Sequence, residues 1–198
     1  MPSRRKFIIG SVGISTALAG CTGVVDRAIE ETNSGSSSGT NSDSDTGSSL
    51  DNPENRRDLV ETYNGAIGSA NEGTGARSEG INAQSNEEHS TSVSRFESAE
   101  AAFAAAAEQF ADALTLAFQI DHQGAIDACK DGNEYGRTME SAMSIAGSSS
   151  EAAEMGAINE ANKMLNDAKE MESEAQQLNI LDTKRIAEML DVERQGGF

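Results

Sequence analysis

Residues 96–120 read FESAEAAFAAAAEQFADALTLAFQI and carry the clearest periodic pattern in the chain. Large and small apolar residues recur in it at steps of three and four, at Phe96, Ala99, Phe103, Ala106, Phe110, Ala113, Ala117 and Ile120. Because an α-helix turns once in ~3.6 residues, this spacing puts all eight on one stripe of a helix. Leu114 and Phe118 widen the stripe to the width of a core-facing surface. Ser94 and Glu97 form a capping box, so we expect the helix to begin there and to end at Ile120.

A weaker pattern precedes this helix. Apolar side chains recur at helical spacing, at Val60, Tyr63, Ile67 and Ala70. Pro53 suits the first turn of a helix, so we expect a helix over 54–84. Its second half is rich in glycine and the stripe fades there, which leaves open whether residues 73–92 are helical. Residues 86–92 have the composition of a turn.

After Ile120 the register of the apolar residues slips, which requires a turn. A third stripe then follows, at His122, Ala125, Cys129, Gly132, Gly136, Met139, Met143 and Ala146. Asp121 is the expected N-cap of this helix. We expect the run GSSS at 147–150 to end it, because Ser148 forms a capping box with Glu151 for the next helix.

The fourth stripe again alternates small and large side chains, at Ala157, Ala161, Met164, Ala168, Met171, Ala175 and Leu178. We expect Ile158 and Leu165 to widen it. It predicts a helix from 151 to about 180, and then a short helix that Asp182 caps and that ends at Gly196-Gly197. Four helices of similar length with short turns predict an all-α fold, an antiparallel up-down-up-down four-helix bundle. The alternative is a three-helix bundle of the last three long helices, with residues 53–92 loosely attached.

The first 21 residues contain two motifs and an apolar run that overlaps both. Ser3-Arg4-Arg5-Lys6-Phe7 gives a basic start, the 13-residue apolar stretch extends from Phe7 to Ala19, and Leu18-Ala19-Gly20-Cys21 ends the segment. This order describes an export signal. At ~1.5 Å per residue the apolar stretch is about 20 Å long, short of a ~30 Å hydrocarbon core, so we expect no permanent membrane span there.

The first motif resembles a twin-arginine signal, whose pathway is associated with the export of folded proteins. The second resembles a lipobox, in which the cysteine is lipidated and becomes the mature N-terminus. The resemblance implies that Arg4 and Arg5 belong to the export signal, that residues 1–20 are removed, and that lipid on Cys21 holds the protein at the cell membrane, facing outside. It covers about a tenth of the chain and implies nothing about the chemistry of the remainder.

The composition is strongly acidic, with 33 Asp and Glu against 15 Lys and Arg and a net charge of −18. Nucleic-acid binding is excluded as a main function, because neutralising phosphates requires a basic patch. An acid-rich, lysine-poor surface resembles that of proteins from salt-loving archaea, where molar salt screens self-repulsion. With the two N-terminal motifs, the chain resembles a haloarchaeal lipoprotein exported by the twin-arginine route.

Residues 33–52 contain eight serines and a single apolar residue, Leu50. Such a segment cannot bury enough surface to offset its chain entropy, and it is expected to be a flexible linker. We therefore expect three parts: a signal peptide at 1–20, a lipid-attached tether at 21–52 and a helical domain at 53–198.

Metal-binding patterns in the helical domain are weak. Cys129 and His122 lie seven residues apart on one stripe, and Met139 and Met143 add soft donors. These methionines lie two turns or more beyond the cysteine, so we expect buried side chains and no metal. Neither His89 nor His122 follows a glutamate by three residues, as di-iron bundles require.

Catalytic patterns are also missing from the sequence. Glu87, Glu88 and His89 fall in a predicted turn, while Glu170, Glu172 and Glu174 alternate around a helix and are expected on the surface. The one G-x-S-x-G match, GSSSG at 35–39, falls in a serine-rich segment with no predicted strand before it, and we find no glycine-rich phosphate loop. We therefore expect no enzyme activity, no catalytic residue and no cofactor.

Two functions from different classes remain. The first is a non-catalytic interaction module of the cell envelope, bound to a partner protein through an exposed, low-charge strip. The glycine-rich second half of the 54–84 helix is a candidate strip. The second is a helical bundle that binds a solute or a sensory ligand between its helices. That function requires convergent polar groups, and only His122, Asn133 and Tyr135 lie near the inner stripes. The sequence favours the first.

Overall fold

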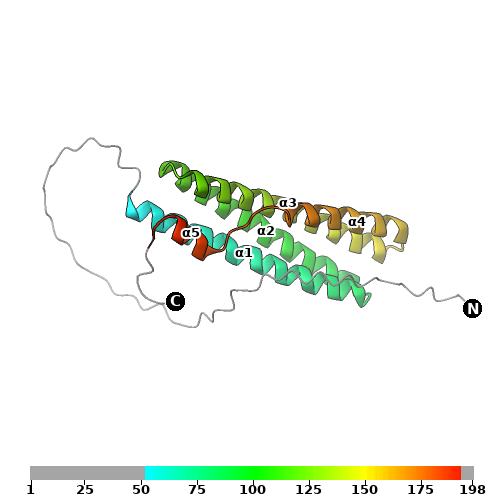
Figure 1. Cartoon of the computed structure of the whole chain (residues 1–198). Helices are drawn as coiled ribbons and strands as arrows, with labels where there is room; N and C mark the ends of the chain where they lie inside the picture. The colour runs from blue at the N-terminus through cyan, green and yellow to red at the C-terminus, as the bar shows by residue number, and fades with distance from the viewer. Residues whose placement is uncertain (1–51, 193–198) are drawn as a thin grey trace, which may run out of the picture. The chain divides into compact units, whose positions relative to one another are not determined.

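The structure is a computed structural model that describes residues 52–192. The helices are α1 (Pro53–Ser85), α2 (His89–Gln119), α3 (Gln123–Glu154), α4 (Ile158–Ala175) and the short α5 (Thr183–Met189). Each long helix runs antiparallel to the one before it (Figure 1). The predicted four-helix bundle with a short C-terminal helix is therefore confirmed. The predicted signal peptide and all of the tether except Asn52 lie outside the described residues.

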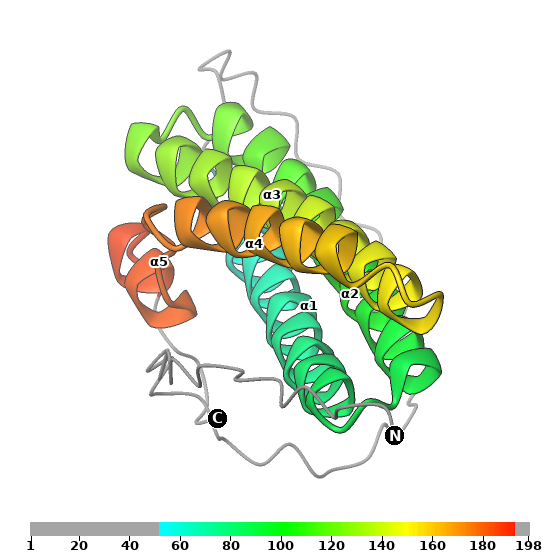
Figure 2. The same cartoon turned by 90° about the vertical axis from the view of Figure 1, so that its right-hand side faces the viewer.

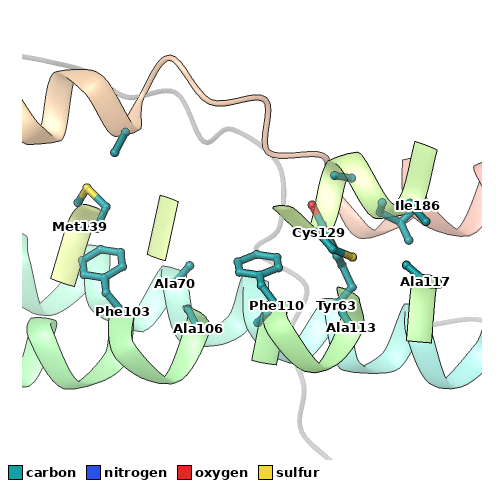
Figure 3. Close-up of a cluster of buried hydrophobic side chains, with 14 of the residues drawn as sticks. Tyr63, Ala70, Phe103, Ala106, Phe110, Ala113, Ala117, Cys129, Met139 and Ile186 are labelled. Carbon is teal, nitrogen blue, oxygen red and sulfur yellow. The ribbon is translucent and has the colours of Figure 1, made fainter. Parts of the chain in front are cut away.

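The aromatic stripe of α2 forms the centre of the core, and all eight of its predicted residues are buried. Its three phenylalanine rings lie against glycines of the neighbouring helices. A Cβ atom added to Gly73 of α1 would be 2.9 Å from the ring of Phe103, and one added to Gly132 of α3 would be 2.5 Å from Phe110. Figure 3 shows Phe103 and Phe110 in this core, with Ala70 and Ala106 between them. The absence of side chains at the glycines lets each ring approach a helix backbone closely.

The glycine-rich half of α1 is helical, which answers the question that the sequence left open. Asn52 caps the helix by accepting a hydrogen bond from the Asn55 backbone N–H at 2.7 Å. The helix then continues to Ser85 without a break and packs along α2. The alternative of a three-helix bundle with a loosely attached first segment is wrong.

The first turn is shorter than predicted and spans residues 86–88. The Glu88 N–H closes it by donating to the Ala83 carbonyl at 2.9 Å, and Glu87 has a positive φ of 62°. Consequently α2 begins at His89, and Ser94 lies inside the helix, where its carbonyl accepts from the Ser98 hydroxyl at 2.8 Å. The predicted capping box at Ser94 is wrong.

The second turn also differs in its cap. Asp121 has a positive φ of 52° and lies within the turn, so the prediction that it caps α3 is wrong. His122 is the N-cap, and its Nδ1 atom accepts from the Ala125 N–H at 3.2 Å. Phe118, in the last turn of α2, is 56% exposed and does not widen the core-facing stripe as predicted.

The serine-rich run at 147–150 does not end α3, which continues to Glu154. Ser149 and Ser150 are buried, and their hydroxyls form hydrogen bonds to other helices, so the helix continues through them. The turn comes instead at 155–157, where Gly156 has a φ of +78°. The predicted capping box of Ser148 and Glu151 is therefore wrong.

The last long helix is shorter than expected, because α4 spans 18 residues and ends at Ala175. The chain then returns to α1, where the Tyr63 hydroxyl donates to the Leu181 carbonyl at 3.0 Å. Asp182 caps α5 as predicted, accepting from the Arg185 N–H at 2.8 Å. However, α5 ends at Met189 and does not reach the glycine pair at 196–197.

The bundle is less tightly closed between α1 and α4 than elsewhere. No Cα atom of α4 lies within 8 Å of one in α1, whereas α4 packs on α3 (Figure 2). The buried side chains on this face of α4 are mostly alanines: Ala161, Ala168 and Ala175. Within residues 52–192, none of the helices combines the length and the apolar composition that crossing a bilayer requires.

Two glycine substitutions distinguish the effect of close helix packing on the free energy of unfolding from the effect of helix propensity. At Gly136 an added Cβ would lie 2.8 Å from the backbone nitrogen of Ala107, so we expect Gly136→Ala to lower the free energy of unfolding by about 1–3 kcal/mol. At Gly68 nothing lies within 4 Å, so Gly68→Ala should raise it by about 0.5–1 kcal/mol. Urea unfolding followed by circular dichroism measures both. Equal stabilisation by the two variants would contradict the close approach of α2 and α3.

Candidate functional site

The sequence-predicted metal candidates have structural roles. Cys129 is fully buried, and Figure 3 shows it beside Tyr63. Burial raises the pKa of the Cys129 thiol to about 12, so the thiol stays protonated at neutral pH and is a poor nucleophile. His122 uses Nδ1 to cap α3, about 10 Å along the helix axis from Cys129 at ~1.5 Å per residue. Within residues 52–192, no three His, Cys, Asp or Glu side chains are grouped as metal ligands.

The polar residues suggested for ligand binding also contact protein groups. The Asn133 side chain of α3 donates to the Ala107 carbonyl of α2 at 2.7 Å. The Tyr135 ring meets Phe103 edge-on, with centroids 6.0 Å apart, and its hydroxyl interacts with the Thr74 side chain. These groups stabilise the contacts of α3 with α2 and α1.

An ion pair that the sequence analysis missed joins α1 to α4. Arg77 donates from Nε to Glu172 Oε1 at 2.6 Å and from Nη2 to Oε2, which makes a two-point contact. The side chains of Arg77 and Glu172 are 21% and 9% exposed. The hydrogen bonds to Glu172 raise the pKa of Arg77, so the guanidinium stays charged. Since the two backbones are far apart here, these long side chains span the open side of the bundle.

The prediction that Glu172 lies on the surface is wrong, and the sequence did contain the contrary signal. Glu172 follows Ala168 by four residues and precedes Ala175 by three, so it shares their buried stripe. Arg77 follows Ala70 by seven residues and occupies the inner face of α1 in the same way. One charge of each sign on two inner stripes indicates a buried pair, because an unpaired buried charge is too costly.

Serine hydroxyls join the helices at the end of the bundle where α1 meets α2. Ser92 donates to the Gly80 carbonyl at 2.9 Å and lies 2.9 Å from the Ser150 hydroxyl. Ser149 donates to the Ala161 carbonyl of α4 at 2.8 Å, and the Gln84 side chain of α1 donates to Ser149 at 3.4 Å. All four long helices are therefore linked at this end by groups that are buried or partly buried. Nearby, Nδ1 of His89 is buried without a hydrogen-bond partner.

The glycine-rich half of α1 has one face that packs in the core and another that contacts no other helix at its glycines. Gly73 and Gly80 are buried beneath phenylalanine rings, whereas an added Cβ at Gly68 or Gly75 would meet nothing within 4 Å. The predicted low-charge strip is thus partly a packing surface for α2.

Three large hydrophobic side chains of the described residues are exposed, and they lie at opposite ends of the bundle. Phe118 is at the end where α1 begins, and Lys130 Nζ lies 5.8 Å from the centre of its ring. At the other end are Met155, in the turn between α3 and α4, and Ile158, the first residue of α4 (Figure 1). The prediction that Ile158 widens the core-facing stripe of α4 is therefore wrong.

The Arg77–Glu172 pair gives a direct stability test. Arg77→Met leaves a buried carboxylate without its partner, and we expect a loss of about 2–4 kcal/mol in the free energy of unfolding. The double variant Arg77→Met/Glu172→Leu buries no charge and should recover most of that loss. Urea unfolding of both single variants and the double variant completes the cycle.

The matched control for this cycle is Lys184→Met, which removes an exposed pair with Glu188 and should cost less than about 0.5 kcal/mol. A double variant whose loss equals the sum of the two single losses would show that the pair does not couple α1 to α4.

The comparisons found no protein-family model that matches the chain, and no match among curated proteins or solved structures.

Proposed function

We propose that this protein is a membrane-anchored extracytoplasmic lipoprotein whose helical domain is a non-catalytic interaction module of the cell envelope. The observation that carries the proposal is the order of two motifs, Ser3-Arg4-Arg5-Lys6-Phe7 and Leu18-Ala19-Gly20-Cys21, within the first 21 residues. Their resemblance to a twin-arginine signal and a lipobox gives a route out of the cell and a lipid attachment point.

The place where the folded domain begins supports this arrangement. Asn52 caps α1, 31 residues after Cys21. A linker of about 30 residues with the composition of 33–52 has a root-mean-square span of roughly 30 Å, at ~5–6 Å times the square root of its length. The domain would then be held close to the membrane surface and would be free to reach a neighbouring protein.

The interior of the domain supports interaction through the surface more than ligand binding between helices. Asn133, Ser149 and Tyr63 bind backbone carbonyls of other segments, and Arg77 binds Glu172. These polar groups already stabilise helix contacts, so a ligand would have to displace them. A solute- or sensory-ligand-binding bundle is therefore the weaker alternative.

Lipid attachment is tested with the two cysteines of the chain. Two acyl chains anchor a protein stably, whereas one chain binds marginally, so we expect the intact protein to enter the detergent phase on partitioning. Cys21→Ser should remain in the aqueous phase because it has no lipid. Cys129→Ala is the matched control and should partition as the unaltered protein does. If Cys21→Ser and the unaltered protein partition alike, the proposed anchor is wrong.

A further inference from the structure

Two large apolar side chains are exposed among acidic residues where α3 turns into α4, one in the turn and one at the first residue of α4. Met155 is 78% exposed and Ile158 is 37% exposed. Exposed glutamates surround them in the sequence and in the adjoining turn, at Glu87, Glu88, Glu151, Glu154 and Glu160. We call these seven residues the distal tip.

The fold does not require large apolar side chains at these positions. The turn is held by backbone hydrogen bonds, from the Met155 N–H to the Glu151 carbonyl at 3.1 Å and from the Ala157 N–H to the Ala152 carbonyl at 2.8 Å. Gly156, with its φ of +78°, supplies the conformation that the turn needs. Complete burial of an exposed methionine or isoleucine side chain is worth about 1.5–3 kcal/mol, so a partner that covered Met155 would gain most of that value and one that covered Ile158 a smaller part of it.

The two turns of the distal tip are held together by the fold. Ser92 of α2 lies 2.9 Å from Ser150 of α3, and both hydroxyls are buried. The Gln84–Ser149–Ala161 contacts join the end of α1 to the beginning of α4. The acidic turn at 86–88 and the turn at 155–157 therefore lie at the same end of the bundle (Figure 1).

The distal tip lies at the opposite end of α1 from Asn52. The tether joins the domain at Asn52, and α1 extends 33 residues from there, about 50 Å at ~1.5 Å per residue. The tip is therefore separated from the point where the proposed tether would join the domain.

Charge identifies the kind of partner. Five glutamates lie in the tip, and the basic residues beside it are Lys163 and Arg95, of which Arg95 pairs with Glu79 at 3.1 Å. A second copy would place the same glutamates face to face, and an anionic lipid surface would also be repelled. A surface with an apolar centre and a basic rim is complementary to the tip.

We propose, on the basis of the proposed function, that the distal tip binds a protein that presents apolar side chains flanked by lysine and arginine. The apolar contact supplies affinity, and the glutamates steer the basic rim and set the orientation of the complex.

The test uses the full chain with Cys21→Ser, which is expected to remain in solution, and a labelled 18-residue helical peptide with leucines on one face and lysines along both edges. Fluorescence anisotropy measures its binding. We expect Met155→Ser/Ile158→Ser to weaken binding at least tenfold while circular dichroism stays unchanged. Glu154→Gln/Glu160→Gln should weaken binding severalfold and reduce its dependence on salt.

The matched control is Phe118→Ser, which removes an exposed hydrophobic side chain at the opposite end and should leave binding unchanged. The proposal is overturned if the peptide does not bind the protein. It is also overturned if the peptide binds the Met155→Ser/Ile158→Ser and Phe118→Ser variants equally well. The proposal is also overturned if the protein forms a dimer in sedimentation and Met155→Ser/Ile158→Ser abolishes that dimer. The same holds if the protein binds anionic vesicles and this double change abolishes the binding. If the peptide-binding test fails while partitioning still depends on Cys21, the distal tip is not a binding site and the lipoprotein proposal is unaffected.

Discussion

The contact of aromatic rings with glycine backbone is the constraint on which the rest of this structure depends. Phe96 and Phe103 lie seven residues apart on α2 and meet Gly80 and Gly73, which lie seven apart on the antiparallel α1. Phe110 meets Gly132 of α3 in the same way. All three rings are buried, and burial of a phenylalanine side chain is worth up to about 3 kcal/mol. Glycine and alanine let the helices approach, so a few large residues fill the core of a chain in which only 4% of residues are aromatic.

The α4 helix depends on a different kind of contact. It packs on α3 through a face rich in alanine, and its buried glutamate reaches across to Arg77 of α1. At one end Ser149 ties α3 to α4, and at the other end the segment after α4 is tied to α1 through Tyr63. Buried polar groups therefore fix the position of α4 where close backbone packing does not. If the domain is the proposed interaction module, its buried polar groups stabilise the fold, and binding would use groups on the surface.

The sequence predicted the fold well where one periodic signal determined it. Each residue of the Phe/Ala stripe is buried, because a helical period encodes a buried face directly. The helix ends were predicted poorly. A capping box is worth about 1 kcal/mol and is a local preference, so tertiary contacts can overrule it, as they did around Ser94 and Ser148. The buried serines next to these positions bond to neighbouring helices, and no single-helix pattern contains that information. The Arg77–Glu172 pair was predictable from the two inner stripes, but only if the helices were already known to be neighbours across the bundle.

The contact of aromatic rings with glycine backbone is tested most directly by a double-mutant cycle between Gly132→Ala and Phe110→Leu. Urea unfolding measures the free energy of unfolding of each variant. An added Cβ at Gly132 would lie 2.5 Å from Cδ1 of Phe110, so Gly132→Ala alone should cost about 2 kcal/mol or more. With Phe110→Leu in place, the same change should cost much less, which gives a coupling energy of at least about 1 kcal/mol. Additive losses, within about 0.5 kcal/mol, would mean that the ring does not lie on the glycine backbone and would contradict this account of the fold.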